Sequence, residues 1–217
     1  TDHQADAGKL LVVSSGDQVA RYLRGKSVAN EDTGRPGLYI MPGNGTLATV
    51  ERMLRSELDI DPNALHDAAE LLREAGQNFD YLIIDTAKKG ELQHAAVLAA
   101  DVLVIPTMLD LASASNTVTM VRLARNLMRE AGRIVILPVG LDGRRRSIQR
   151  QVITQLMGVA DNEPGAPIRI YADGIPQCAA IQNAGMASKT IWEFDPSSEA
   201  AKAYDGFMCW LTEADNG

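Results

Sequence analysis

Cysteine is scarce in this chain, and the features that would mark a secreted or membrane protein are missing as well. The 217 residues include two cysteines, Cys178 and Cys209, which lie far apart and form no CxxC pair. This pattern excludes a disulfide framework and favours a reducing compartment. No stretch approaches the roughly 18 consecutive apolar residues that a membrane-spanning helix needs, and no signal peptide is visible. We therefore expect a soluble, cytoplasmic protein.

Positive charge is also in short supply. Lys and Arg number 21 against 28 Asp and Glu, so the formal net charge is -7. Such a chain repels nucleic acid overall, and any DNA contact must come from a local basic patch. The three histidines, His3, His66 and His94, show no spacing typical of metal ligands. We interpret them as surface or hydrogen-bonded residues.

Short apolar runs, separated by helical patterns, define the expected fold. They cover residues 38–41, 81–85, 102–106, 134–139 and 168–171. Runs that are apolar throughout are typical of strands buried on both faces of a parallel sheet. The alternation of strand and helix predicts one α/β domain over residues 1–217, with an open, mostly parallel sheet and helices on both faces.

Three helix starts can be read from capping residues. The Asp-Pro pairs at 61–62 and 195–196 each offer an N-cap followed by proline at the first helical position. Ser113 or Ser115 could cap a helix that runs to Arg129.

Ligands of an open parallel sheet bind at the carboxyl ends of its strands. The segment YLIIDTA, residues 81–87, has the form of a Walker B strand, with Asp85 at the tip of an apolar run. A carboxylate there can hold a water molecule bound to Mg²⁺, which takes only one or two protein carboxylates. The alternative is a structural one, because Asp also ends strands as a turn residue.

Four segments in order carry a family resemblance. They are YLIIDTA, AAVLAADVLVIPTMLDLASA, GLDGRRRSIQRQV and IPQCAAIQNAGMASKTIWEFDPSSEAAKAYDGF. Together they resemble the ParA/Soj branch of the deviant Walker A ATPases, a superfamily that also contains MinD. The resemblance runs from Asp2 to about Leu211. It implies a P-loop NTPase-like fold, ATP or ADP with Mg²⁺, a homodimer, non-specific DNA and a ParB-like centromere-binding partner.

The resemblance also assigns roles to individual residues. Asp2 matches the second Asp of the family's D-x-D-P-Q motif, with His3 in place of Pro, and would place the attacking water. Asp85 and Thr86 would lie at the nucleotide, with Asp85 on the metal through water. Asp142 and Pro176 would contact the nucleobase, although ordinary loop residues are the alternative there. The two prolines of the family's D-x-P-P are absent after Asp85.

The family's phosphate loop, K-G-G-x-G-K-[ST], belongs upstream of D-x-D-P-Q and has no counterpart in the printed sequence. We therefore expect a fold without its N-terminal strand and P-loop. GMASKT, residues 185–190, ends like a Walker A motif, but that motif needs glycine where Asn183 and Ser188 stand. We interpret it as a helix end that leads to a short extended segment.

Four arginines, Arg144, Arg145, Arg146 and Arg150, form the one concentrated basic patch. At the start of a helix they would oppose its dipole, so folding does not require them there. They would bind DNA phosphates, or else form a solvated face. Near the end of the chain, apolar side chains at helical spacing predict core packing rather than a membrane anchor: Tyr204, Phe207, Met208 and Leu211.

Three functions follow from these residues and the resemblance. The first is a ParA-like, nucleoid-associated ATPase for DNA segregation or cargo positioning, which is an enzyme only if the full protein supplies the P-loop. The second is a truncated or P-loop-less module that binds a partner without hydrolysing ATP. The third is an ATPase that positions another cargo, in conjugation or cell division.

Overall fold

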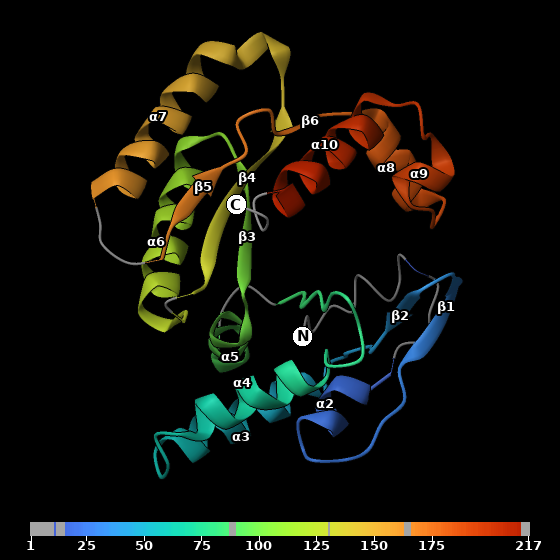
Figure 1. Cartoon of the computed structure of the whole chain (residues 1–217), viewed down its shortest axis with the longest axis vertical. Helices are drawn as coiled ribbons and strands as arrows, with labels where there is room; N and C mark the ends of the chain where they lie inside the picture. The colour runs from blue at the N-terminus through green and yellow to red at the C-terminus, as the bar shows by residue number, and fades with distance from the viewer. Residues whose placement is uncertain (1–10, 12–15, 87–89, 130, 163–165, 214–217) are drawn as a thin grey trace. The chain divides into compact units, whose positions relative to one another are not determined.

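The computed structural model describes residue 11 and residues 16–86, 90–129, 131–162 and 166–213 (Figure 1). Two compact units meet in sequence at Ala100 and Asp101. Asp2 lies outside the described residues. No helix of the described residues is long and apolar enough to cross a membrane.

The first unit is mainly helical. Its elements are α2 (Gln18–Tyr22), β1 (Glu31–Arg35), β2 (Leu38–Ile40), α3 (Leu47–Leu58), α4 (Ala64–Glu74) and α5 (Glu91–Ala99). One core cluster joins α2, α3, α4 and α5 through side chains such as Leu47, Val50 and Leu92. A second cluster packs α4 against α5 through small residues, with Ala69 and Ala95 fully buried. The small side chains let the two helices approach closely.

Two strand predictions for this unit need correction. Residues 81–86 form no strand, and Tyr81 and Ile83 are 71% and 89% exposed. An apolar run forms a strand only where a neighbouring strand hydrogen-bonds to its backbone. No described strand pairs with residues 81–86. The run at 38–41 does form a strand, but β2 pairs antiparallel with β1 in a two-stranded hairpin rather than joining the parallel sheet.

The second unit holds the parallel sheet. Its elements are β3 (Val102–Met108), α6 (Leu111–Leu127), β4 (Arg133–Leu141), the 3₁₀ turn η1 (Gly143–Arg145), α7 (Arg146–Asn162), β5 (Ile168–Ile170), β6 (Ile175–Pro176), α8 (Ala179–Met186), α9 (Ile191–Phe194) and α10 (Glu199–Glu213). The strand order is β3-β4-β5, and the short β6 also pairs with β4. All these pairings are parallel, which confirms the predicted strands at 102–106, 134–139 and 168–171.

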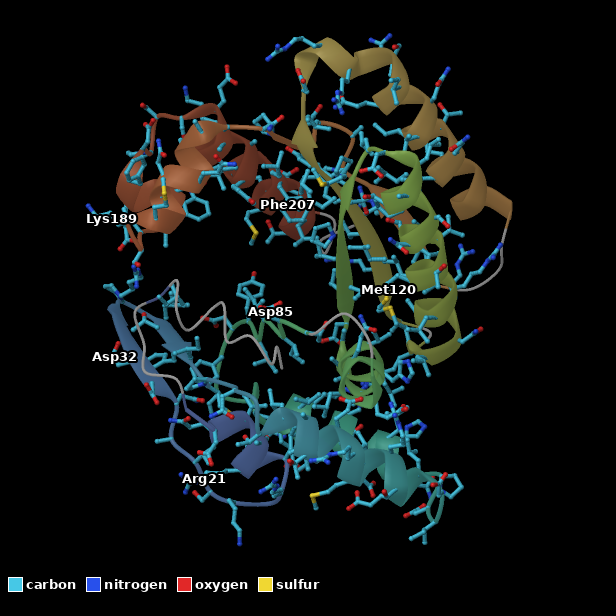
Figure 2. All side chains as sticks on the ribbon, turned by 180° about the vertical axis from the view of Figure 1, so that it is seen from behind. Arg21, Asp32, Asp85, Met120, Lys189 and Phe207 are labelled. Atoms are coloured by element: carbon cyan, nitrogen blue, oxygen red, sulfur yellow. The ribbon has the colours of Figure 1, made fainter. Side chains whose placement is uncertain are left out.

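Helices cover both faces of this sheet (Figure 1). On one face, the buried hydroxyls of Thr107 on β3 and Thr117 on α6 lie 2.8 Å apart. On the other face, Val135 and Leu137 of β4 pack in one cluster with Phe207 of α10, which Figure 2 labels. The predicted α/β class, with an open parallel sheet between two helical layers, is therefore confirmed.

The last helix packs into this core as predicted, except at one position. Phe207 is buried, and Tyr204 and Leu211 are half-buried against the same cluster. Met208 is 44% exposed, so it lies on the solvent side of α10.

The helix starts differ from the predicted caps in a consistent way. Asp110, not Ser113 or Ser115, caps α6, because its carboxylate accepts from the backbone N–H of Ser113 at 2.8 Å. This hydrogen bond and a second one, from the Ser113 hydroxyl at 3.0 Å, hold the pKa of Asp110 below its ordinary value. The helices predicted at the two Asp-Pro pairs begin two to three residues later, at Ala64 and Glu199. In each pair the aspartate accepts instead from the backbone N–H two residues ahead, in a turn that precedes the helix.

Candidate nucleotide-binding edge

The carboxyl end of β4 brings together two residues that the sequence predicted as one site. Leu141, the last residue of β4, is the register partner of Pro176 on β6, and Gln177 donates its backbone N–H to the Leu141 carbonyl at 2.9 Å. Asp142 follows Leu141 directly. The parallel pairing therefore places Asp142 beside Pro176 at the carboxyl edge of the sheet, where ligands of open α/β sheets bind.

Asp142 also organises the turn that leads into α7. Its Oδ1 accepts from the backbone N–H of Arg144 at 2.9 Å and lies 3.5 Å from the Nε of the same residue. Its carbonyl accepts from the backbone N–H of Arg145 at 2.9 Å. The side chain is 28% exposed, so one side of the carboxylate faces solvent. A carboxylate fixed in this way can accept a further hydrogen bond from an amino group of a ligand.

Sequence reasoning missed Gln149 at this edge. With its side-chain amide turned to satisfy both partners, Gln149 accepts from the Asp142 N–H at 3.0 Å and donates to the Asp142 carbonyl at 3.3 Å. These two hydrogen bonds fix the backbone of Asp142, and Gln149 lies one turn inside α7. The sequence shows that residue 149 is polar, but it does not show the turn that brings this side chain to Asp142.

The basic patch lies at the same edge. Arg144 and Arg145 form the 3₁₀ turn after β4, and Arg146 is the first residue of α7. The side chains of Arg144, Arg145 and Arg150 are exposed. Cations at a helix start face the positive end of the dipole, so their position is unfavourable for the helix itself.

The predicted metal residues lie in the first unit. Asp85 (Figure 2) is exposed and Thr86 is half-buried, at the end of the stretch 81–86, which forms no strand. The helix that follows is anchored by Glu51 of α3, whose carboxylate accepts from the backbone N–H groups of Glu91 and Leu92. Asp85 and Thr86 are thus in a different unit from Asp142 and Pro176.

The donor set can be compared with what Mg²⁺ and a nucleotide require. Among the described residues, no group of three His, Cys, Asp or Glu could hold a metal ion. A single carboxylate such as Asp85 still suits Mg²⁺, which keeps most of its water and takes other ligands from phosphate. The chemistry of this single carboxylate is thus compatible with a hydrated Mg²⁺, and no described residue supplies a glycine-rich phosphate loop.

The Walker-like GMASKT is a helix end, as predicted. α8 ends at Met186, Ser188 follows two residues later with φ +52, and Lys189 donates its backbone N–H to the Ala184 carbonyl at 3.0 Å. After this helix end, Thr190 has extended backbone, with φ -67 and ψ 161. Thr190 also caps the short helix α9 through a capping box with Glu193.

Comparison with known proteins agrees with this architecture. No family model and no curated protein matches the chain. Among solved structures, apo McdA from Cyanothece is 17% identical, with a TM-score of 0.74 over 90% of this chain and 79% of that one. MinD from Pyrococcus horikoshii with Mg-ADP is 18% identical, with a TM-score of 0.64 over 92% and 75%. A ParA family ATPase from Chlorobium tepidum is 19% identical, with a TM-score of 0.63 over 88% and 74%.

The chain has the fold of the MinD/ParA ATPases. The resemblance inferred from four sequence segments is confirmed at the level of fold. Identities of 17–19% carry no residue roles with them. The roles of Asp85, Thr86, Asp142 and Pro176 therefore stay predictions.

A substitution at Gly174 tests the close approach to β4 of the chain that leads into β6 and Pro176. Gly174 has φ +57, and an added Cβ would lie 2.6 Å from Leu141 Cδ1 and 2.9 Å from the Pro138 carbonyl oxygen. We expect Gly174→Ala to lower the free energy of unfolding by about 1–3 kcal/mol, measured by urea denaturation.

The matched control is Gly158→Ala in α7, where an added Cβ meets nothing within 4 Å. We expect this change to raise stability by up to about 1 kcal/mol, because alanine favours a helix over glycine. Unchanged or higher stability in Gly174→Ala would contradict the close approach of β6 to β4.

Proposed function

We propose that the chain is the greater part of a ParA/MinD-like ATPase that positions DNA or another cargo. The observation that carries the proposal is that Asp142 directly follows Leu141, the register partner of Pro176, at the carboxyl end of β4, in a fold shared with ATPases. The proposal treats residues 1–217 as one functional domain. Its partners are a second copy of the chain, non-specific DNA and a ParB-like protein, as the resemblance implies, which gives a nucleoid-associated cytoplasmic protein.

Each candidate residue has a distinct task in this proposal. Asp142 accepts a hydrogen bond from the base, and Pro176 packs against the base. Asp85 holds a Mg²⁺-bound water and Thr86 lies next to it, while Asp2 orients the attacking water. Phosphoryl transfer depends chiefly on such positioning and on charge stabilisation. Hydrolysis also needs a phosphate loop, which the full protein must supply.

A second candidate function is a binding module without hydrolysis. It is favoured by the exposed stretch that carries Asp85, which forms no strand and so does not hold this carboxylate at a strand tip. A third is an ATPase that positions another cargo, since the fold does not name its cargo. ATP turnover with Mg²⁺ separates the first and third candidates from the second.

The first prediction concerns the base site. We expect Asp142→Ala to weaken binding of a fluorescent ATP analogue to the full protein roughly tenfold or more, the usual loss for a hydrogen bond to a charged group. Asp142→Asn keeps an acceptor for the Arg144 N–H but removes the charge. This variant therefore separates the effect of losing the charge from the effect of disturbing the local turn. If nucleotide affinity is unchanged in both variants while their melting curves match the parent, Asp142 has no role at the nucleotide.

The second prediction concerns the basic patch. We expect Arg145→Ala with Arg150→Ala to weaken non-specific DNA binding and to reduce the slope of log K against log salt by about 0.9 for each lost phosphate contact. The control pair is Lys189→Ala with Lys202→Ala, two exposed cations elsewhere in the same unit. An unchanged slope in the arginine variant would identify the patch as a solvated face.

A further inference from the structure

A groove lies between α3 and α4 in the first unit, and none of its lining residues is one assigned above. Its volume is about 500 Å³, and all its lining residues belong to this unit. Its floor is apolar: Val50, Leu54, Ala64 and Leu92 are 3–8% exposed. The floor is thus part of the packed core that joins α3, α4 and α5, so it is a fixed feature of the unit.

The mouth of the groove extends this apolar surface into solvent. Met53 of α3 is 45% exposed, and Ile60, in the loop between α3 and α4, is 87% exposed. Isolated apolar residues on a surface are ordinary, but these two flank a concave apolar floor. A continuous apolar patch with a polar rim is typical of an interaction site. Methionine adds a flexible side chain that adapts to different partners.

The rim of the groove is acidic. Three carboxylates line it, those of Glu57, Asp61 and Asp67, against one guanidinium, that of Arg24. The Asp61 carboxylate accepts from the backbone N–H of Asn63 at 2.8 Å. Among the described residues, no ion pair involves Glu57 or Asp67. An occupant of this groove therefore meets negative charge around an apolar floor.

We propose that this groove binds a short amphipathic segment of a partner protein, with apolar side chains on the floor and Lys or Arg side chains against the acidic rim. Two adjoining helices with an apolar furrow between them form the surface on which amphipathic segments dock. Charge complementarity selects a cationic partner and rejects an acidic one. The proposal goes beyond the nucleotide site and depends on none of its residues.

The test uses the full protein and a fluorescent 14-residue peptide of leucine and lysine with helical apolar periodicity. We expect saturable binding by fluorescence anisotropy, weakened by Ile60→Ser and by added salt. Glu57→Gln with Asp67→Asn removes two rim charges with little change in shape. We expect it to weaken binding about fivefold, as the loss of two exposed charge pairs implies.

The matched control is Asp173→Asn with Glu213→Gln, which removes two exposed carboxylates in the second unit. We expect it to leave peptide affinity within twofold of the parent, and melting curves to show that all variants fold. Three results would overturn the proposal: equal weakening by the control pair, equal binding of a leucine-glutamate peptide, or equal binding of an oligolysine without leucine. The assay contains no nucleotide, so its failure and that of the ATPase proposal are separate.

Discussion

The parallel pairing of β3 and β4 is the interaction on which the second unit depends. Backbone groups buried under helices must be hydrogen-bonded, and this ladder, in register from Val102 with Arg133 to Met108 with Val139, satisfies them. Ile134, Val135 and Ile136 of β4 are at most 1% exposed, so the strand tolerates no polar side chain in its middle. Polar residues can appear only where the strand ends. The same ladder that stabilises the core therefore concentrates the candidate chemistry at one edge.

At that edge, one short segment serves both structure and proposed function. Asp142 caps the turn into α7 and is itself clamped by Gln149, while the arginines that follow stand at a helix start where their charge is unfavourable. A negative charge before the helix offsets part of that cost, on the order of 0.3–1 kcal/mol per charge near a helix terminus. An anion at this edge would lower the electrostatic cost further. The proposed contact with the base and the proposed contact with DNA phosphates thus lie a few residues apart.

The strands of the second unit could be predicted because uninterrupted apolar runs such as residues 134–139 report burial on both faces. The same signal was wrong about structure at residues 81–85, because composition reports the tendency to be buried and not the presence of a pairing partner. Capping was predictable only in outline, since Asp110 and Ser113 are both good caps and the choice depends on backbone geometry. The two-residue β6 and the four-residue α9 are too short to leave a periodic signal. Gln149 and the α3–α4 groove arise from tertiary packing and have no sequence motif.

The central claim is that the base of a nucleotide binds beside Asp142 and Pro176. Photolabelling of the full protein with 8-azido-ATP and Mg²⁺, followed by tryptic mapping, tests it most directly. The account predicts ATP-protectable label in the peptides 134–144 and 170–189, which contain these two residues. ATP-protectable label confined to other peptides would contradict it.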